Sequence, residues 1–283
     1  MPSIVAVYSN YNWNSKGLRL NTGLIDVCFN CSHDSFDTDR STVLERAAQA
    51  GVTSMISPGS DLSDSAKSLT LSEQYPNLYT SVGIHPHNAK TWTERSYQEL
   101  KRLSIHNKTL AIGETGLDYN RNFSPPNKQR DVFEQQIHLA IETKLPLFMH
   151  QRDAHDDFIE LLKPLRNRVG NAVVHCFTGD ERMLYDYLDL DLYIGITGWI
   201  CDERRGNHLN NLIDKIPLQR LLVETDAPYL LPRNLEPAPK GRRNEPAFLP
   251  HIVEQIATSS KNDFTTIATM SSTNAKQFFS LDT

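Results

Sequence analysis

Short apolar runs alternate with amphipathic segments along the chain from Leu24 onward. The runs are rich in β-branched and aromatic residues, which is typical of strands that are buried on both faces. They lie at residues 24–29, 54–57, 79–84, 110–114, 146–150, 172–177, 192–197 and 221–226. The pattern therefore predicts eight buried strands.

The segments between these runs carry apolar residues at helical spacing. One begins at Ser124, Pro125 and Pro126, which are typical of a helix start, and continues with Phe133 and Ile137. Others contain VLERAAQAG, which closes on Gly51, the residues Tyr97, Leu100 and Leu103, and the residues Phe158, Leu161, Leu162 and Leu165. Eight strands, each followed by a helix, predict an α/β fold of the (β/α)8 TIM barrel type.

A doubly wound open sheet is the alternative fold. The sequence has no G-x-G-x-x-G and no Walker loop that would favour it. We therefore expect one TIM-barrel domain over residues 24–283, preceded by a polar N-terminal extension at residues 1–23.

The composition is that of an ordinary soluble protein, with 39% hydrophobic and 22% charged residues in a chain of 283. No apolar run approaches the roughly 18 residues that a membrane helix needs. The net charge of −5 argues against a protein that coats long nucleic acid through a continuous basic face. The first residues lack a basic leader, and four cysteines in so long a chain are not a disulfide framework, so we expect a cytoplasmic protein.

Side chains that bind metals lie at or near the ends of four apolar runs. They are Glu114, His150, His175 and Asp226. In a barrel the carboxyl ends of the strands meet at one mouth, so these groups are expected to converge. Mixed nitrogen and oxygen donors suit Zn²⁺, Mn²⁺, Co²⁺ or Fe²⁺, and, with added water, Mg²⁺. A divalent cation there would lower the pKa of bound water and favour hydrolysis.

Each of these residues has a simpler interpretation when taken alone. A single histidine at a strand end is commonly a hydrogen-bonded core residue, and an aspartate close to a proline is often a turn former. Four such ends together favour a metal site if the fold is a barrel. Glu224 shares a strand face with Asp226, so it either orients a ligand or anchors a barrel layer by hydrogen bonds.

Six segments in order resemble the TatD family of metal-dependent deoxyribonucleases. They are GIHPH (83–87), GETGLDYNRN (113–122), FMHQRDAH (148–155), HCFTG (175–179), YIGITGWICDERRG (193–206) and ETDAPYLLPR (224–233). The resemblance covers nearly the whole chain after residue 23, and the coincidence of six signatures makes it specific.

The resemblance implies an amidohydrolase-type barrel with a divalent metal. Mg²⁺ is the first expectation, with Mn²⁺ or Zn²⁺ as alternatives. It also implies hydrolysis of DNA phosphodiesters, as a 3′–5′ exonuclease on the 3′ ends of single strands, and a role in DNA repair or degradation. The family's ligands fall on Glu114, His150, His175 and Asp226, the same four residues found at the strand ends. No membrane and no obligate protein partner are expected.

The first strand departs from the family pattern. Much of the family has His-x-His at its end, where this chain has Cys28 and Asn30. This difference favours one firmly bound ion over two. Cys28 and Cys31 have three possible roles: structural burial, which we favour; a Cys28 thiolate on the metal; and a disulfide switch.

The working hypothesis gives each group of the site a role. Glu114, His150 and His175 hold the metal, and Asp226 binds or orients the attacking water and takes its proton. His85 is a second catalytic candidate, which donates to the phosphate or protonates the leaving oxygen. His87 either shares this function or forms a rigid turn by bonding to the backbone.

Basic and aromatic residues after the seventh and eighth strands are candidates for binding substrate. Arg204 and Arg205 follow the seventh strand, and Arg242 and Arg243 lie in the Pro- and Arg-rich segment 231–250. Trp199 is a candidate for stacking on a terminal base. The alternatives are an ion-paired surface with Asp202, Glu203 and Glu245, and a tryptophan that caps the core.

Two other functions are alternatives to the nuclease. An amidohydrolase-type enzyme acting on an ester or amide often uses a carboxylated lysine, and no lysine ends any of the eight runs. A barrel without catalysis, binding nucleic acid or a partner, is supported only by the missing His-x-His.

Overall fold

The computed structural model describes residues 23–239 and 241–281. The predicted N-terminal extension lies outside these residues, apart from Gly23. The chain divides into two compact units. The first combines the described residues up to Met55 with Ile196–Ala275, and the second combines Ile56–Gly195 with the residues from Lys276 onward. The single domain expected from residue 24 onward stays a prediction.

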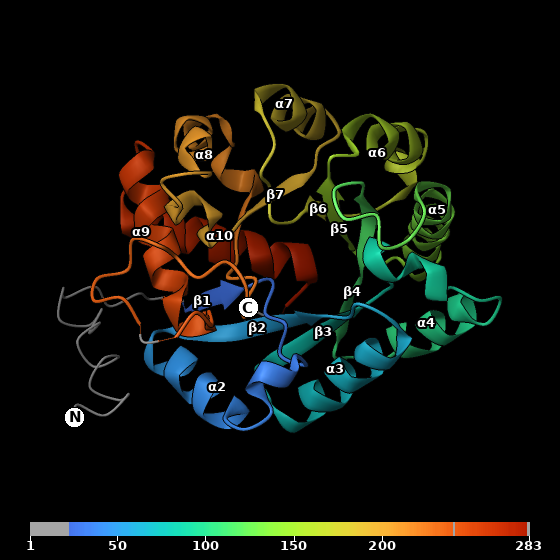
Figure 1. Cartoon of the computed structure of the whole chain (residues 1–283), viewed down its shortest axis with the longest axis horizontal. Coiled ribbons are helices and arrows are strands. Elements are labelled where there is room, and N and C mark those ends of the chain that lie inside the picture. The colour runs from blue at the N-terminus through green and yellow to red at the C-terminus, as the bar shows by residue number, and fades with distance from the viewer. Residues whose placement is uncertain (1–22, 240, 282–283) are drawn as a thin grey trace. The chain divides into compact units, whose positions relative to one another are not determined.

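Eight strands form one sheet in the order β1 to β8 (Figure 1). They are β1 (Leu24–Asp26), β2 (Val52–Pro58), β3 (Leu78–Val82), β4 (Thr109–Asp118), β5 (Leu147–Arg152), β6 (Ala172–Val174), β7 (Tyr193–Ile196) and β8 (Leu221–Val223). The pairs β1–β2, β3–β4, β4–β5, β5–β6 and β6–β7 are parallel. All eight predicted strands are present.

Helices lie between the strands. The α-helices are α2 (Arg40–Gln49), α3 (Leu62–Gln74), α4 (Ser96–Ser104), α5 (Pro126–Thr143), α6 (His155–Leu162), α7 (Glu181–Asp189), α8 (Asn207–Leu212), α9 (Leu249–Ser259) and α10 (Phe264–Phe279). Short 3-10 helices are η2 (Asp34–Phe36), η3 (Pro86–Thr91), η4 (Lys163–Arg168), η5 (Gly198–Cys201), η6 (Ile213–Lys215), η7 (Leu218–Arg220) and η8 (Pro246–Phe248). This alternation of parallel strands and helices confirms the predicted (β/α)8 fold class.

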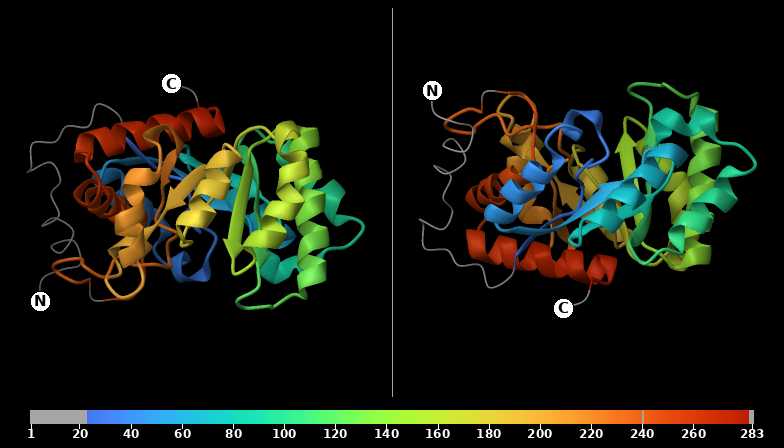
Figure 2. Two further views of the ribbon diagram at one scale, coloured as in Figure 1. Left: turned by 90° about the horizontal axis from the view of Figure 1, so that it is seen from above. Right: turned by 90° about the horizontal axis from the view of Figure 1, so that it is seen from below.

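In the second unit, helices cover one side of strands β3 to β5 (Figures 1 and 2). Helix α3 packs against β3, and α5 packs against β4. Helix α5 buries Phe133, Ile137 and Ala140, which recur at helical spacing. Phe133 stacks on Phe158 of α6, with ring centroids 5.1 Å apart. The apolar positions that predicted the helix are those that hold it to the sheet.

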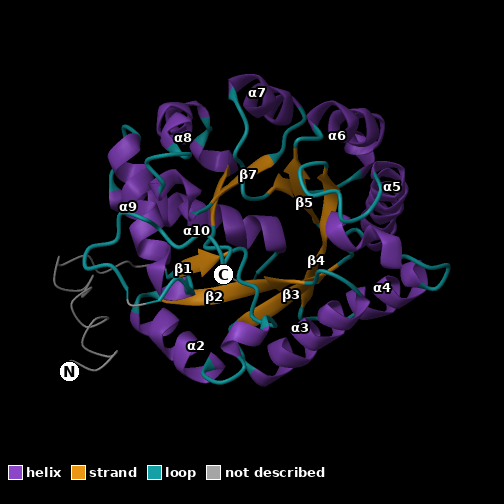
Figure 3. Ribbon diagram, in the orientation of Figure 1, coloured by secondary structure: helices purple, strands orange, loops and turns teal. Residues whose placement is uncertain are grey.

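In the first unit, α9 packs against β1 (Figure 3) and also against β8. The segments that follow these two strands run side by side, because Phe29 and Ala227 form a parallel bridge. The amide of Asn30 donates to the Ala227 carbonyl at 2.9 Å, and the amide of Asp226 donates to the Cys28 carbonyl at 2.8 Å. These main-chain bonds fix the positions of Cys28, Asn30 and Asp226 relative to one another.

Strands β4 and β5 continue by at least two residues beyond the ends that the apolar runs predicted. Strand β4 reaches Asp118 and β5 reaches Arg152, so Glu114 and His150 lie within strands instead of at their ends. Gly116 makes the continuation possible. It pairs with His150 and has φ 132°, and a Cβ there would overlap the His150 carbonyl oxygen. Conversely, β6 and β8 end earlier, at Val174 and Val223, so His175 and Asp226 follow them.

None of the helices within residues 23–239 and 241–281 is long and apolar enough to cross a membrane.

Candidate metal centre

One carboxylate oxygen of Glu114 faces three histidine nitrogens in the second unit. Oε1 of Glu114 lies 2.8 Å from His175 Nε2, 3.1 Å from His150 Nδ1 and 3.2 Å from His85 Nε2. The donor atoms of His85, Glu114 and His150 all lie within 4.8 Å of one another, which allows a single ion to contact all three. Imidazole nitrogen and carboxylate oxygen are common ligands of divalent metals. The chain therefore carries a candidate divalent metal site.

Main-chain bonds place Glu114 and His175. Glu114 lies on β4 and its amide donates to Gly59 O at 3.0 Å; His175 follows β6 and its amide donates to Met149 O at 2.9 Å. Gly113, directly before Glu114, has φ 147°, and a Cβ there would overlap the carbonyl oxygen of Phe148. Strands β4 and β5 can approach closely only because this position has no side chain.

The charge states in this cluster suit a cation. Burial by itself raises the pKa of Glu114, but the charge of His175 and the hydrogen bonds from His150 and His175 outweigh it and hold the pKa well below its ordinary value. Burial lowers the pKa of His85 to about 4, against the opposing effect of Glu114. An ionised carboxylate and a neutral imidazole are the forms that bind a metal.

Asp118 supports the cluster and was missed by the sequence reasoning. Its Oδ2 accepts hydrogen bonds from His150 Nε2 at 3.0 Å and from His87 Nε2 at 2.9 Å. Because Nε2 of His150 donates to Asp118, Nδ1 of the same ring faces Glu114. A carboxylate behind a histidine commonly orients that histidine toward a metal. The alternation Glu114, Gly116, Asp118 along β4 was the available signal, but the strand was expected to end at Glu114.

Asp118 and Glu114 together favour positive charge at His150. Burial would lower the pKa of His150, but hydrogen bonds to the two carboxylates raise it. Burial would raise the pKa of Asp118, but the hydrogen bonds from His150 and His87 lower it. A proton and a metal ion therefore compete for the same ring nitrogen. His87, for which two roles were open, bonds to a side chain of this cluster instead of to the backbone.

Asp226 lies in the first unit, where Asn30 and Cys28 hold its carboxylate. Oδ1 of Asp226 accepts from Asn30 Nδ2 at 3.0 Å and from Cys28 Sγ at 3.6 Å. Its backbone is left-handed, with φ 54°, a conformation that aspartate tolerates better than most residues. Whether Asp226 shares one ion with Glu114, His150 and His175 stays a prediction.

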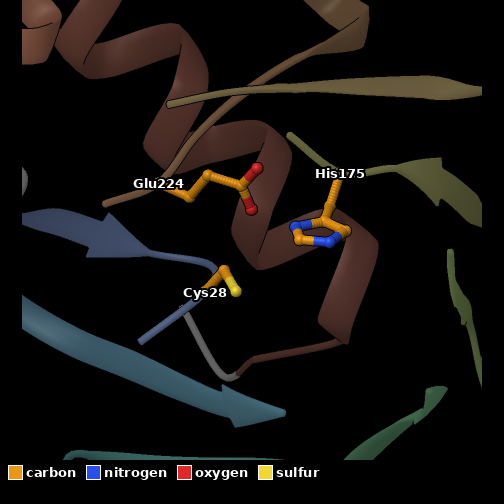
Figure 4. Close-up of side chains that lie close together, drawn as sticks. All are labelled: Cys28, His175 and Glu224. Atoms are coloured by element: carbon orange, nitrogen blue, oxygen red, sulfur yellow. The ribbon is translucent and has the colours of Figure 1, made fainter. Parts of the chain in front are cut away.

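Two further acidic groups are buried beside these residues. Cys28 Sγ and a carboxylate oxygen of Glu224 lie within 4.8 Å of each other (Figure 4). Asp26 accepts from the amide of Thr225 at 2.9 Å, and its Oδ2 lies 2.5 Å from the Thr225 hydroxyl. Burial raises the pKa of Asp26 to about 8. Asp26 was missed, although it is the one acidic residue in the apolar run 24–29.

The cysteines are free thiols, and Cys28 and Cys31 are both buried. Burial was the favoured role among the three considered for them. The hydrogen bond from Cys28 to Asp226 is a contact that the sequence did not predict.

The residues predicted to bind substrate lie in the first unit, and most of them contact other side chains of the protein. Arg204 pairs with Asp202 at 3.1 Å, and Arg205 lies over the Trp199 ring at 5.4 Å from its centroid. Arg243 bonds to Asp39 at 2.6 Å and to Glu245 at 2.9 Å, whereas Arg242 is exposed. Their role in binding substrate stays a prediction.

Comparison with known proteins connects this centre to a family. The sequence model described as TatD related DNase matches residues 25–280. The chain is 48% identical to the 3′-5′ ssDNA/RNA exonuclease TatD of Edwardsiella piscicida, over 91% of this chain and 100% of that protein. It is 44% identical to the protein of the same name from Salmonella typhimurium, over 90% and 98%.

Solved structures agree with this relationship. The TatD homologue YJJV of Escherichia coli has a TM-score of 0.83 at 29% identity, and the match covers 92% of this chain and 98% of that one. A TatD family hydrolase of Entamoeba histolytica has a TM-score of 0.82 at 26% identity, covering 92% and 99%. The resemblance seen in the six sequence segments is confirmed: this chain belongs to the family of TatD-related DNases.

Proposed function

We propose that this protein is a metal-dependent exonuclease that hydrolyses phosphodiester bonds at the 3′ ends of single-stranded DNA. The observation that carries the proposal is the convergence of three histidine nitrogens on one oxygen of Glu114. Membership of the TatD-related DNases and relatives named 3′-5′ ssDNA/RNA exonuclease support the substrate and the polarity.

Glu114, His150 and His175 are the proposed metal ligands. A bound divalent ion supplies positive charge that lowers the pKa of water and offsets the charge of a phosphoryl oxygen. Asp118 keeps His150 oriented, with Nε2 donating to the carboxylate and Nδ1 facing Glu114. His85, whose Nε2 lies 3.2 Å from Glu114 Oε1, is the proposed group that donates to the phosphate or to the leaving oxygen.

Asp226 is the proposed base that orients the attacking water and takes its proton. Asn30 and Cys28 both donate to its Oδ1, so they fix the orientation of the carboxylate. A base must be held within hydrogen-bond reach of the proton that it removes. This assignment rests on the position of Asp226 after β8 and on the family resemblance.

Mg²⁺ is the proposed metal, bound as one firmly held ion, with Mn²⁺ or Zn²⁺ as competitors. The mixed donors are compatible with each of these ions when water completes the coordination. Action in the cytoplasm, in DNA repair or degradation, is part of the same proposal.

The test uses purified metal-free protein and a single-stranded oligonucleotide labelled at its 5′ end. With Mg²⁺ we expect a ladder that shortens from the 3′ end, and no products in the presence of a chelator. An oligonucleotide blocked at its 3′ end should not be cut. Glu114→Gln and Asp226→Asn should each abolish most of the activity, whereas Glu134→Gln, an exposed position on α5, should not.

Two results would contradict the proposal. One is wild-type protein that binds a divalent ion but cuts no single-stranded DNA with Mg²⁺, Mn²⁺ or Zn²⁺. The other is full activity of the Glu114→Gln protein. Products that shorten from the 5′ end would overturn the polarity alone.

A further inference from the structure

Phe123 is exposed to solvent beside the metal centre. The residue is 55% exposed, one of four large hydrophobic residues in the described chain with this degree of exposure; the others are Ile105, Tyr185 and Tyr229. Its ring meets the ring of His87 edge-on, with centroids 4.9 Å apart and an interplanar angle of 77°. Single exposed apolar residues are common on protein surfaces, so exposure alone does not indicate a function. The position of Phe123 beside the metal centre is the feature that points to one.

His87 joins Phe123 to the histidines around Glu114. The His87 ring lies 4.4 Å from the ring of His85 and 6.2 Å from that of His150, centroid to centroid. Its Nε2 bonds to the same Asp118 oxygen that receives the hydrogen bond from His150. Phe123 is therefore separated from the candidate metal ligands by a single imidazole ring.

The backbone before Phe123 is held in place by hydrogen bonds. Oδ1 of Asp118 accepts from the amides of Asn120 at 3.0 Å and Arg121 at 2.9 Å. The Asn122 side chain donates to the Tyr119 carbonyl at 2.7 Å, and Asn122 has a left-handed φ of 50°. The carboxylate that orients His150 thus also shapes the loop that presents Phe123.

The backbone after Phe123 is fixed as well. Ser124 is buried, and its hydroxyl donates to the His87 carbonyl at 2.8 Å and accepts from the Lys90 amide at 3.0 Å. Gln129 donates to the Ser124 carbonyl at 2.9 Å. An exposed aromatic ring that a rigid loop holds in one position loses little conformational entropy when a ligand binds against it.

We propose that Phe123 is a stacking platform for a nucleobase of the single-stranded substrate whose phosphodiester bond is hydrolysed at the metal centre; this inference rests on the proposed function. Every base has a π-face, so an aromatic platform accepts any sequence, as an exonuclease that moves along a strand requires. Arg121, two residues earlier and also exposed, offers a cation to the adjacent phosphates. Stacking of this kind typically changes affinity about 5- to 100-fold per base.

The test compares Phe123→Ala, Phe123→Trp and, as a matched control, Tyr185→Ala, which removes another exposed aromatic ring of the same unit, on α7. Steady-state cleavage is measured on an ordinary oligonucleotide and on one with abasic sites in its last nucleotides. We expect Phe123→Ala to raise KM about 5- to 100-fold on the ordinary strand, with a smaller change in kcat. Phe123→Trp should restore the wild-type KM, and Tyr185→Ala should not change it.

The abasic strand tests the contact itself. Without a base to stack on, wild type and Phe123→Ala should have the same KM. Binding measured by fluorescence anisotropy in proteins that also carry Glu114→Gln should show the same loss of affinity without any cutting. Phe123→Ala with a KM within twofold of wild type, or with an equal loss on both strands, would overturn the inference while leaving the nuclease intact. Wild-type protein that cuts neither strand would overturn the proposed function, and this inference with it.

Discussion

The side-chain amide of Asn30 donates a hydrogen bond of 3.0 Å to Oδ1 of Asp226, and a second one of 3.1 Å to the carbonyl of Ala227. Asn30 stands at a position where a histidine was expected from the family pattern. In this protein the side chain donates to the carboxylate of the proposed base and holds it in one orientation.

Asn30→Ala should lower kcat about 10- to 100-fold with little change in KM, because the carboxylate of Asp226 loses the donor that fixes its orientation. Steady-state kinetics on single-stranded DNA measures both parameters. Asn234→Ala, at an exposed asparagine of the same unit, is the control and should match wild type. An Asn30→Ala protein with wild-type kcat would show that Asp226 needs no such support.

Asp118→Asn should weaken metal binding about 10- to 100-fold without abolishing it, because the carboxylate behind His150 is replaced by an amide with a donor on one side. Isothermal titration with Mn²⁺ measures this affinity independently of DNA cleavage. Asp156→Asn, at an exposed aspartate on α6, should leave the affinity unchanged. Equal affinities of Asp118→Asn and wild type would mean that the ligands are oriented by packing alone.

Asp26 should make the protein less stable as the pH rises from about 4 to about 8. Its pKa is raised by burial from 3.8 to about 8, so over this window the unfolded chain releases the proton while the folded protein keeps it. The free energy of unfolding then falls by at most about 1.4 kcal/mol per pH unit and levels off above the folded-state pKa.

Asp26→Asn resembles the neutral acid and has no proton to lose. The difference in unfolding free energy between this variant and wild type should therefore grow in favour of the variant across the same pH window. Urea unfolding at pH 5, 6, 7 and 8 measures it, with Asp156→Asn as the control. A constant difference would show that the Asp26 carboxyl is ionised in the folded protein.

Arg243 and Arg242 are adjacent but should differ in their contribution to stability. Arg243 bonds to Asp39 and to Glu245, and Glu245 is also bound by Arg46 at 2.8 Å. Arg243→Ala removes charged hydrogen bonds from partly buried partners and should lower the free energy of unfolding by about 1–3 kcal/mol. Arg242→Ala, at an exposed site, should leave it unchanged. Urea unfolding tests this pair, and equal stability of the two variants would contradict it.

If both arginines also bind the substrate, each variant should raise KM on single-stranded DNA. If KM rises in Arg242→Ala but not in Arg243→Ala, then Arg243 stabilises the fold and does not bind substrate. This comparison decides between the binding role predicted from the sequence and the ion-paired alternative.

The strands could be predicted because parallel strands covered on both faces are almost entirely apolar, as 172–174 and 221–223 are here. That Glu114, His150 and His175 lie close together could be predicted because metal-binding residue types interrupt such runs. The observed end of β4 could not be predicted, because Gly116 and Asp118 continue this strand only through pairing with β5. Pairing between strands is a tertiary property that no single run contains.

The contacts of Asp118 and Asn30 and the exposure of Phe123 could not be predicted from the sequence for a related reason. Asp118 is important because two histidines from other segments reach it, and Phe123 because the surrounding chain leaves its ring uncovered. Each depends on neighbours that are distant in sequence.

The contact between β4 and β5 at Gly113 and Gly116 has a consequence for redesign of this enzyme. Since main chain meets main chain there, the separation between Glu114 and His150 is set by peptide groups and is insensitive to exchanges of the surrounding hydrophobic side chains. Attempts to change which nucleic acids the enzyme accepts therefore have to keep these two glycines, because a side chain at either position would overlap the main chain of β5.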